Sequence, residues 1–595
     1  MRISRRQFHL SLMAGLATLA LPRSTSAATR PDLWLNRLTF GATAESHASF
    51  TAMGPTSWLD DQLARPATDA TIRHYLTDAR LQIAYPAGSD ENGHTWPALD
   101  QLRPLSTLNA DPADLTRLID WSLGMDFSER TRPASEVIAA ALIRAVHTPA
   151  QLREVMTQFW HDHFNVNALR DAFTAAFFPA HDAALRDHAL GNFRTLLGET
   201  ARQPAMLCYL NNADSRASPA NENYARVLLE LHTLGAAAYL NDRHSRWQDV
   251  PGAAEGLAQG CLDLDVYEVA RAFTGWTVGD GRYVNDGCDA PKTGRFHYVE
   301  AWHDPYQKRV PGVEFPPNRA PLQDGEQVLD LLATHPATAR FIATKLARRR
   351  LTDSPSPALT DHPARTFLAH VDAPDQIAHV IRALVLHPDF TTTPPGKLRR
   401  PFEFVAALYR ATGAPITGTT NAHQWQLMRA GWRQHEYPVP TGHPDTLDKW
   451  TGASALNRLV DMALYAHDDW CGVTSLDLAA TTTTGTETTT ETTTATTGQF
   501  LDRWTTPLGS TGLAADMTLD PALPASAFTD AERHSAAATA AATAIAFAAL
   551  TPQFLLRRRH AKPAKPDANL ASSWVPKYPT GEETLVSSTK VSRGW

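Results

Sequence analysis

The stretch PASEVIAAALIRAV (residues 133–146) carries the strongest helical pattern in the chain. Apolar residues recur there at the three- and four-residue spacing of a buried helical face, namely Val137, Ile138, Ala141, Leu142 and Ala145. Thr148-Pro149 follows, and Thr as N-cap with Pro in the first turn predicts a second helix that runs through Phe159. The sequence therefore predicts helix packed against helix in this part of the fold.

Helical spacing recurs on both sides of this stretch. Further helices are predicted at residues 179–197, 204–210, 221–234, 264–273, 325–348, 375–386, 401–412, 453–467 and 529–550. Alternating strands are scarce. One short hairpin is predicted, with strands at residues 282–284 and 295–299, and residues 85–108 are predicted to be a loop because they contain Pro, Gly and Asn. The predicted fold class is mainly α: an irregular multi-helix single large domain with long loops and one small β-hairpin.

Composition restricts the class of protein. With 595 residues, of which 43% are hydrophobic, the chain can bury a large core. The net charge of −7 gives no basic excess, so nucleic acid is not expected as a partner. The cysteines contain no Cys-x-x-Cys pair, so no thiolate zinc site is predicted. A disulfide between Cys261 and Cys288 is left open, because an oxidising compartment would allow it.

The N-terminus has the pattern of an export signal. Ser4-Arg5-Arg6-Gln7-Phe8 precedes an apolar run at residues 10–21 and small residues at 24–28. Paired arginines are typical of the twin-arginine pathway, so its translocation machinery is a predicted partner. The apolar run is shorter than the roughly 20 residues that span a bilayer, and no Cys follows it, so no stable membrane anchor is expected. Residues 1–28 are predicted to be a signal peptide, and the protein is predicted to be periplasmic or secreted.

The rest of the chain divides by composition. Residues 29–478 are predicted to form the main helical domain. Residues 479–498 are almost pure Thr, have nothing to bury, and are predicted to be a disordered insertion. Residues 499–559 are predicted to be C-terminal helices of the same domain, and residues 560–595 to be a flexible tail.

The first segment with candidate chemistry is QFWHDHFNVN, residues 158–167. Imidazole and carboxylate together suit a divalent transition metal, and His161 and His163 are the predicted ligands. Residues i and i+2 point about 200° apart on a helix but share a face of an extended chain. A shared metal site therefore requires the helix to end near Trp160 or His161. The alternative is a helix end at which His and Asp side chains cap backbone groups.

The second segment is NENYARVLLELHTLG, residues 221–235. Glu222, Arg226 and Glu230 recur every four residues and share one helical face. If that face is buried, Arg226 clamps two carboxylates whose pKa values are pushed apart, as acid–base catalysis requires, and these three are the predicted catalytic residues. His232, near the end of the helix, is a further predicted metal ligand. The alternative is a ladder of helical salt bridges.

The third candidate lies in a predicted loop. His303, within Trp302-His303-Asp304, could complete a metal site or a sugar-binding site, and the alternative is a structural role. The chain contains no Gly-x-Ser-x-Gly, His-Glu-x-x-His or phosphate-loop motif. No motif therefore fixes a reaction, and the only cofactor that these histidines suggest is a divalent transition metal.

Several segments together resemble a bacterial family, the domain of unknown function 1800. They follow one another in order, at residues 35–41, 159–165, 221–235, 270–276, 335–346, 397–405, 431–432 and 551–554. The resemblance implies an exported and largely helical protein. It also suggests a partner, because members are often encoded beside a second exported family that is similar to phosphatases and sulfatases. Members usually have Glu where this chain has Val227, which is interpreted as a surface position off the Glu222–Arg226–Glu230 face.

Two functions follow as hypotheses. The first is a metal-dependent periplasmic enzyme with a pocket of His and Glu side chains. It requires His161, Glu222 and Glu230 to converge, because ligand bonds are only about 2 Å long. The alternative is a non-catalytic periplasmic or surface protein that binds or assembles polysaccharide, or that binds a phosphatase-like partner. The Trp content and the Thr-rich insertion favour this alternative.

Overall fold

The computed structural model describes residues 31–285, 287–393, 396–413, 416, 418–419 and 421–465. All of them belong to one of the two units into which the chain divides, residues 1–560. Several sequence predictions lie outside the described residues: the signal peptide (1–28), the Thr-rich insertion (479–498), the helices at 499–559 and the tail (560–595). Within the described ranges the fold is mainly α with short strand pairs, as predicted.

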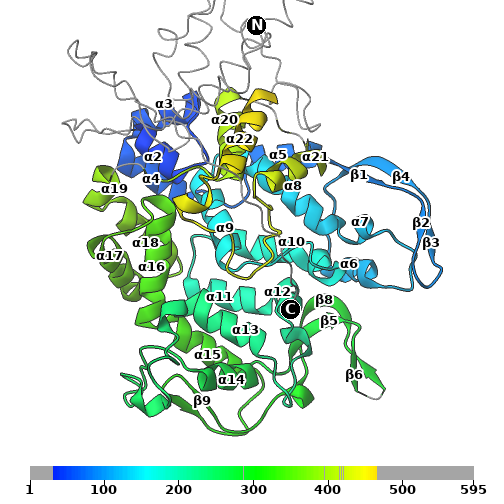
Figure 1. The fold of residues 1–595 in the computed structure, drawn as a ribbon, viewed down its shortest axis with the longest axis vertical. Helices are drawn as coiled ribbons and strands as arrows, with labels where there is room; N and C mark the ends of the chain where they lie inside the picture. The colour runs from blue at the N-terminus through cyan, green and yellow to red at the C-terminus, as the bar shows by residue number, and fades with distance from the viewer. Residues whose placement is uncertain are drawn as a thin grey trace, which may run out of the picture. The chain divides into compact units, whose positions relative to one another are not determined.

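Helices occur along the whole described part of the chain (Figure 1). The N-terminal helices are α2 (Pro31–Leu38), α3 (Ala44–Met53), α4 (Pro55–Ala64), α5 (Ala70–Asp78), α6 (Pro112–Leu115) and α7 (Phe127–Arg130). The middle helices are α8 (Arg132–His147), α9 (Gln151–His163), α10 (Ala172–Asp187), α11 (Phe193–Arg202), α12 (Pro204–Tyr209), α13 (Glu222–Val227), α14 (Asp263–Ala272) and α15 (Gln323–Ala333). The later ones are α16 (Pro336–Arg350), α17 (Pro357–Ala369), α18 (Gln376–Val385), α19 (Pro388–Thr392), α20 (Pro401–Thr412), α21 (Asn421–Arg429) and α22 (Ala453–Tyr465). No helix in these ranges combines the length and the apolar composition that crossing a membrane requires.

Helices α8, α9 and α10 pack against one another and position the site (Figure 1). Helix α8 confirms the helix predicted from residues 133–146, and it is buried on almost every side because α10 and α20 cover it. Helix α9 begins later than predicted. Thr148 ends α8 instead of capping α9, because the Gln151 side chain donates to the carbonyls of Ala145 and Thr148 and closes this corner.

Two long helical predictions correspond to pairs of helices. Residues 179–197 cover the end of α10 and the start of α11, where the Asn192 side chain caps the new helix. Residues 325–348 cover α15 and α16, because His335 caps α16 and Pro336 occupies its first turn. In both cases a capping residue inside an apolar run starts a second helix.

The helix predicted at residues 221–234 changes its winding after α13. Residues Leu228–Thr233 form a π-helical turn, in which the Thr233 hydroxyl donates to the carbonyl of Leu228, five residues earlier. Such turns are rare and are frequent at functional sites. The interpretation of Val227 as a surface position is wrong, because its side chain is buried in the main apolar cluster.

The stretch predicted as a loop at residues 85–108 contains strands. β1 (Arg80–Tyr85) pairs antiparallel with β4 (Leu99–Pro104) and parallel with β11 (Gly418–Thr419), and β2 (Gly88–Ser89) pairs with β3 (Thr95–Trp96). Leu81 and Ile83 are buried on alternate positions of β1, so burial of one face stabilises the pair. Pro86, Asn92, Gly93 and Pro97 lie between these strands, whereas Gly88 and Pro104 lie at strand ends.

The predicted hairpin exists as two strand pairs with other partners. β8 (Lys292–Tyr298) pairs with β5 (Trp276–Asp280), and β6 (Tyr283–Asn285) pairs with β7 (Cys288–Asp289). A further pair, which the sequence did not predict, is formed by β9 (Lys308–Val310) and β10 (Val313–Phe315). β5 is buried along its whole length and therefore provides the partner for β8. Cys261 is buried, Cys288 is exposed and both are free thiols, so the disulfide that the sequence left open does not form.

Helix α9 lies between the two large apolar clusters. Met156 and Phe159 belong to one cluster, and Val155 belongs to the other. The polar residues of its last turns therefore lie in the protein interior, where they require partners from neighbouring segments. This placement makes the end of α9 the candidate functional site.

Candidate functional site

Helix α9 continues through His163, so its two histidines face different neighbours. His161 contacts α10, whereas His163 contacts the π-helical turn and α16. The two side chains point in nearly opposite directions, as expected from the angle of about 200° between positions i and i+2 of a helix. The condition for a metal shared by these two histidines, a helix that ends near Trp160 or His161, is not met.

His161 forms a buried pair with Asp182. Its Nε2 lies 3.0 Å from Asp182 Oδ1, and because a carboxylate can only accept, Nε2 carries the hydrogen. Arg186 and Arg144 bind the same carboxylate at 2.8 and 3.1 Å. Burial alone would raise the pKa of Asp182, but these two guanidinium groups hold it well below its ordinary value. Asp182 is therefore a fixed anion that orients the His161 ring.

His161 also lines a small polar hollow. The hollow has a volume of about 10 Å³, close to the roughly 10–15 Å³ that one water molecule requires. Its wall includes Gln158, His161, Asp162, Asn165, His435 and His443. In the described part of the chain, the ring of His161 forms a hydrogen bond through Nε2 and none through Nδ1. The hollow therefore places space for one water beside a ring that Asp182 holds from its other side.

His435 also lines this hollow and packs directly against His161, with ring centroids 4.0 Å apart. Its backbone has a φ of 57°, a left-handed conformation that is uncommon outside glycine. The carbonyl of His435 accepts from Ala168, and its Nε2 accepts from the Gln434 amide. Burial and the neighbouring His161 hold the pKa of His435 well below its ordinary value, so this imidazole is neutral.

Asp162 forms a second aspartate–histidine pair at the same hollow. Its Oδ1 accepts from His443 Nδ1 at 3.0 Å, and its Oδ2 accepts from Arg400 at 2.7 Å. The other ring nitrogen of His443 accepts from the backbone of Arg433, and the ring stacks on Trp432 with centroids 3.8 Å apart. Both nitrogens of His443 are engaged, whereas His161 and His435 each keep one ring nitrogen, Nδ1, without a hydrogen bond in the described part of the chain.

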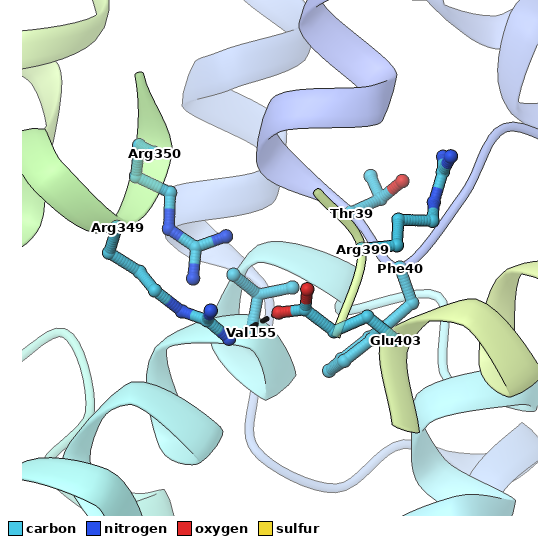
Figure 2. Close-up of a pocket in the computed structure, with 7 residues that line it drawn as sticks. All are labelled: Thr39, Phe40, Val155, Arg349, Arg350, Arg399 and Glu403. Carbon is cyan, nitrogen blue, oxygen red and sulfur yellow. Dashed lines mark hydrogen bonds and ion pairs between the residues drawn. The ribbon is translucent and has the colours of Figure 1, made fainter. Parts of the chain in front are cut away.

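An arginine-lined pocket is linked to this network through Glu403, whose carboxylate lies 3.6 Å from the Arg400 guanidinium. In Figure 2, Arg349 and Arg350 approach it from α16, and the Glu403 carboxylate points toward them from α20. Glu403 bonds Arg349, which also bonds Asp445 at 3.1 Å. The space between these side chains does not admit a water molecule. Glu403 therefore serves as the internal counter-ion of this pocket, and the pocket holds Arg400 in place beside Asp162.

His163, His232 and Lys345 form a third group. His163 Nε2 donates to the backbone carbonyl of His232 at 3.0 Å, and Lys345 Nζ donates to His163 Nδ1 at 2.9 Å. Burial lowers the pKa of Lys345 to about 8 and that of His232 to about 3. The structure thus brings together two of the predicted ligands, but through a backbone carbonyl, and with a lysine that the sequence analysis did not single out.

The predicted catalytic residues Glu222 and Arg226 of α13 and Glu230 of the π-helical turn form a ladder of helical salt bridges, which was the alternative interpretation. Arg226 lies 3.0 Å from Glu230, 3.0 Å from Asp263 of α14 and 3.8 Å from Glu222. The side chains of Glu222 and Arg226 are 48% and 40% exposed, so Arg226 clamps no buried carboxylate pair. A catalytic role of these residues remains a prediction.

His303 belongs to a separate group of ion pairs. Its Nε2 lies 3.2 Å from Asp324, which also binds Lys308 at 2.7 Å, and its Nδ1 faces the Thr274 carbonyl. The predicted metal ligands His161, His163, His232 and His303 therefore have separate partners. Throughout the described ranges, no three His, Cys, Asp or Glu side chains are grouped closely enough to hold a metal ion.

Sequence reasoning found His161 but missed the residues that define its surroundings. Asp182 belongs to α10, Lys345 to α16, and both His435 and His443 to the segment 431–445. The sequence alone does not show that these three segments meet at the end of α9. Two signals were available, because Lys345 and Arg400-Pro401 lie in segments of the family resemblance, and Arg400 proves to hold Asp162.

Comparison with known proteins gives a family but no relative of known activity. No curated protein and no solved structure matches the chain. Residues 33–556 match the family described as "Protein of unknown function (DUF1800)". Because this match covers most of the chain, the protein belongs to the DUF1800 family.

Proposed function

We propose that the protein is an exported enzyme that performs general acid–base catalysis at His161. One observation carries the proposal: Asp182 fixes the hydrogen on Nε2 of His161, and a water-sized hollow adjoins the same ring. In a neutral imidazole, Nδ1 then carries the lone pair and can accept a proton from a bound water. Asp182 would orient the ring and stabilise the imidazolium that forms, as an aspartate does in a catalytic triad.

Access to His161 requires movement of the segment 431–445. Asn165 donates to the carbonyls of Tyr437 and Val439, and the hydroxyl of Tyr209 donates to Pro438. His161 is buried beneath this segment. A substrate therefore reaches the hollow only when these three hydrogen bonds open, which would also expel or admit the bound water.

The place of action is part of the same proposal. Export through the twin-arginine machinery to the periplasm or the exterior rests on residues 1–28. An exported phosphatase- or sulfatase-like protein is the proposed partner, on the family resemblance. The chemistry proposed at His161 assigns no step to a metal, because the described residues do not group the predicted ligands.

The test compares the full exported chain with two variants, His161→Gln and Asp182→Asn. Turnover is measured between pH 5 and 9 on chromogenic carboxylic esters, glycosides, phosphate esters and sulfate esters. His161→Gln is expected to lower turnover by about 10²-fold or more. His74→Gln is the control, because His74 is an exposed histidine, and turnover should not change. Asp182→Asn keeps the size of the side chain and carries the test if His161→Gln does not fold.

Absence of turnover in the wild-type chain, or equal turnover in all variants, would contradict the proposal. That result would favour the alternative, a non-catalytic binding or assembly protein.

A further inference from the structure

Trp121 forms an exposed aromatic surface in the segment between Ile119 and α7. It precedes α7, and 50% of its surface is exposed. The guanidinium of Arg130 lies over the other side of the ring, 4.3 Å from its centroid. Arg130 itself is only 1% exposed. The indole therefore has one face covered by a buried cation and a free surface toward solvent.

Arg130 is locked in place beneath the indole. Its guanidinium donates to the carbonyls of Leu118, Asp120 and Leu123 at 2.8, 3.0 and 2.6 Å. These carbonyls come from the loop that carries Trp121, so the loop wraps around the guanidinium. A side chain held in this way loses little conformational entropy when a ligand stacks on it.

Hydrogen-bonding groups lie beside the ring. Asp120 is the neighbouring residue, and its Oδ1 accepts from the backbone and the hydroxyl of Ser122 at 3.0 and 2.6 Å. These hydrogen bonds, together with the charge of Lys292 at the start of β8, lower the pKa of Asp120. Asp120 is thus a fixed anion whose other oxygen, Oδ2, forms no hydrogen bond within the described residues.

We propose that Trp121 is the stacking platform of a glycan-binding subsite for an uncharged pyranose ring. The C–H face of a sugar packs on an aromatic face, and its hydroxyl groups bond to a carboxylate. The carboxylate of Asp120, in the turn that carries Trp121, disfavours an acidic sugar. A charged rim around one ring also suits a hydroxylated ligand better than an apolar protein surface. This subsite is separate from His161 and does not depend on the proposed catalysis.

The full exported chain is tested by affinity electrophoresis in gels that contain a soluble glucan, xylan, mannan or, as an acidic probe, alginate. The wild-type chain is expected to be retarded by at least one of the three neutral glycans. Trp121→Ala should weaken this binding by at least about 10-fold, as loss of an aromatic anchor does. Asp120→Asn should weaken it by a smaller factor. Binding should quench tryptophan fluorescence in the wild-type chain and not in Trp121→Ala.

Trp425→Ala is the matched control. Trp425 is 47% exposed and lies beneath an arginine, Arg429, at 4.4 Å, but no carboxylate follows or precedes it in sequence. Its replacement should leave glycan binding unchanged. Retardation of Trp121→Ala equal to that of the wild type, or retardation by alginate alone, would overturn the proposal. So would a wild-type chain that no glycan retards, whatever the outcome for His161.

Discussion

The buried network around α9 and the exposed ladder on α13 contain the same side chains in different surroundings. Arg186 bonds Asp182, four residues earlier on its helix, and Glu154 of α9, and all three are buried. Arg226 also bonds two carboxylates, one of them four residues away, but it is exposed to solvent. Water and salt screen the second arrangement, whereas each charge in the first depends on its partners. The same four-residue spacing therefore contributes differently to stability in the buried α9 network and in the exposed ladder.

The two networks should differ most in the stability that is lost when the arginine between their two carboxylates is replaced. Arg186→Met leaves Glu154 buried without a cation and Asp182 with Arg144 as its one remaining arginine, and a loss of about 3–5 kcal/mol in the free energy of unfolding is expected. Arg226→Met should cost no more than about 1 kcal/mol. Urea unfolding of both variants measures the two values. Equal losses would show that burial does not separate the two networks.

The segment that covers the α9 network can be tested at a glycine. Gly442 has a φ of 69°, and a Cβ there would lie 2.0 Å from the Asp162 carbonyl. Gly413, with a φ of 68°, has no atom within 4 Å of the same position. Gly413→Ala should lower the free energy of unfolding by about 1–2 kcal/mol, because alanine disfavours a positive φ. Gly442→Ala should lower it further, because segment 431–445 must also shift to make room for the Cβ atom. Thermal unfolding decides this, and a Gly442→Ala loss no larger than that of Gly413→Ala would contradict the close contact.

Acid should weaken the buried region before the ladder. Burial lowers the pKa of His181 and of His232 from 6.5 to about 3. The unfolded chain then binds more protons than the folded chain, so stability that is complete above pH 6.5 is lost as the pH falls toward 3. The melting temperature should fall across this range, and His181→Gln should reduce the slope. Arg226→Met should leave the slope unchanged, since arginine does not titrate there; a slope equal in the wild type and in His181→Gln would exclude His181 as a cause.

The outer end of the ladder should show the smallest effect. Glu222 lies 3.8 Å from Arg226, and both side chains are well exposed. Glu222→Gln should change the free energy of unfolding by at most about 0.5 kcal/mol, and salt should remove the difference. Denaturation at low and high ionic strength measures this, and a loss above 1 kcal/mol that persists in high salt would assign Glu222 a role beyond the ladder.

Prediction from the sequence succeeded where the pattern is local. The helix at residues 133–146 is confirmed because its apolar positions repeat with the helical period. The helix at residues 401–412 is confirmed with the predicted bounds, since Pro401 starts it and Gly413 ends it. The pairing of β8 with β5 was missed, because strand pairing depends on a partner that lies elsewhere in the chain.

The candidate site shows the same division. The segment 158–167 was identified from its His and Asp residues, but its partners Asp182 and His443 lie about 20 and 280 residues away, as the hydrogen bonds of His161 and Asp162 show. The sequence also could not decide between a buried clamp and an exposed ladder for Glu222, Arg226 and Glu230, because both arrangements have the same i, i+4 spacing.

By itself, the sequence determined the mainly α class, the family and the segment around His161, because helical period, capping residues and ordered motifs are local properties. The tertiary structure alone decided that His161 and His163 face different partners and that, in the described ranges, the four predicted metal ligands do not group as a metal site. It also decided that Arg130 lies beneath Trp121. These outcomes depend on which distant segments share the interior, and burial changes the strength of a charge interaction without changing its sequence spacing.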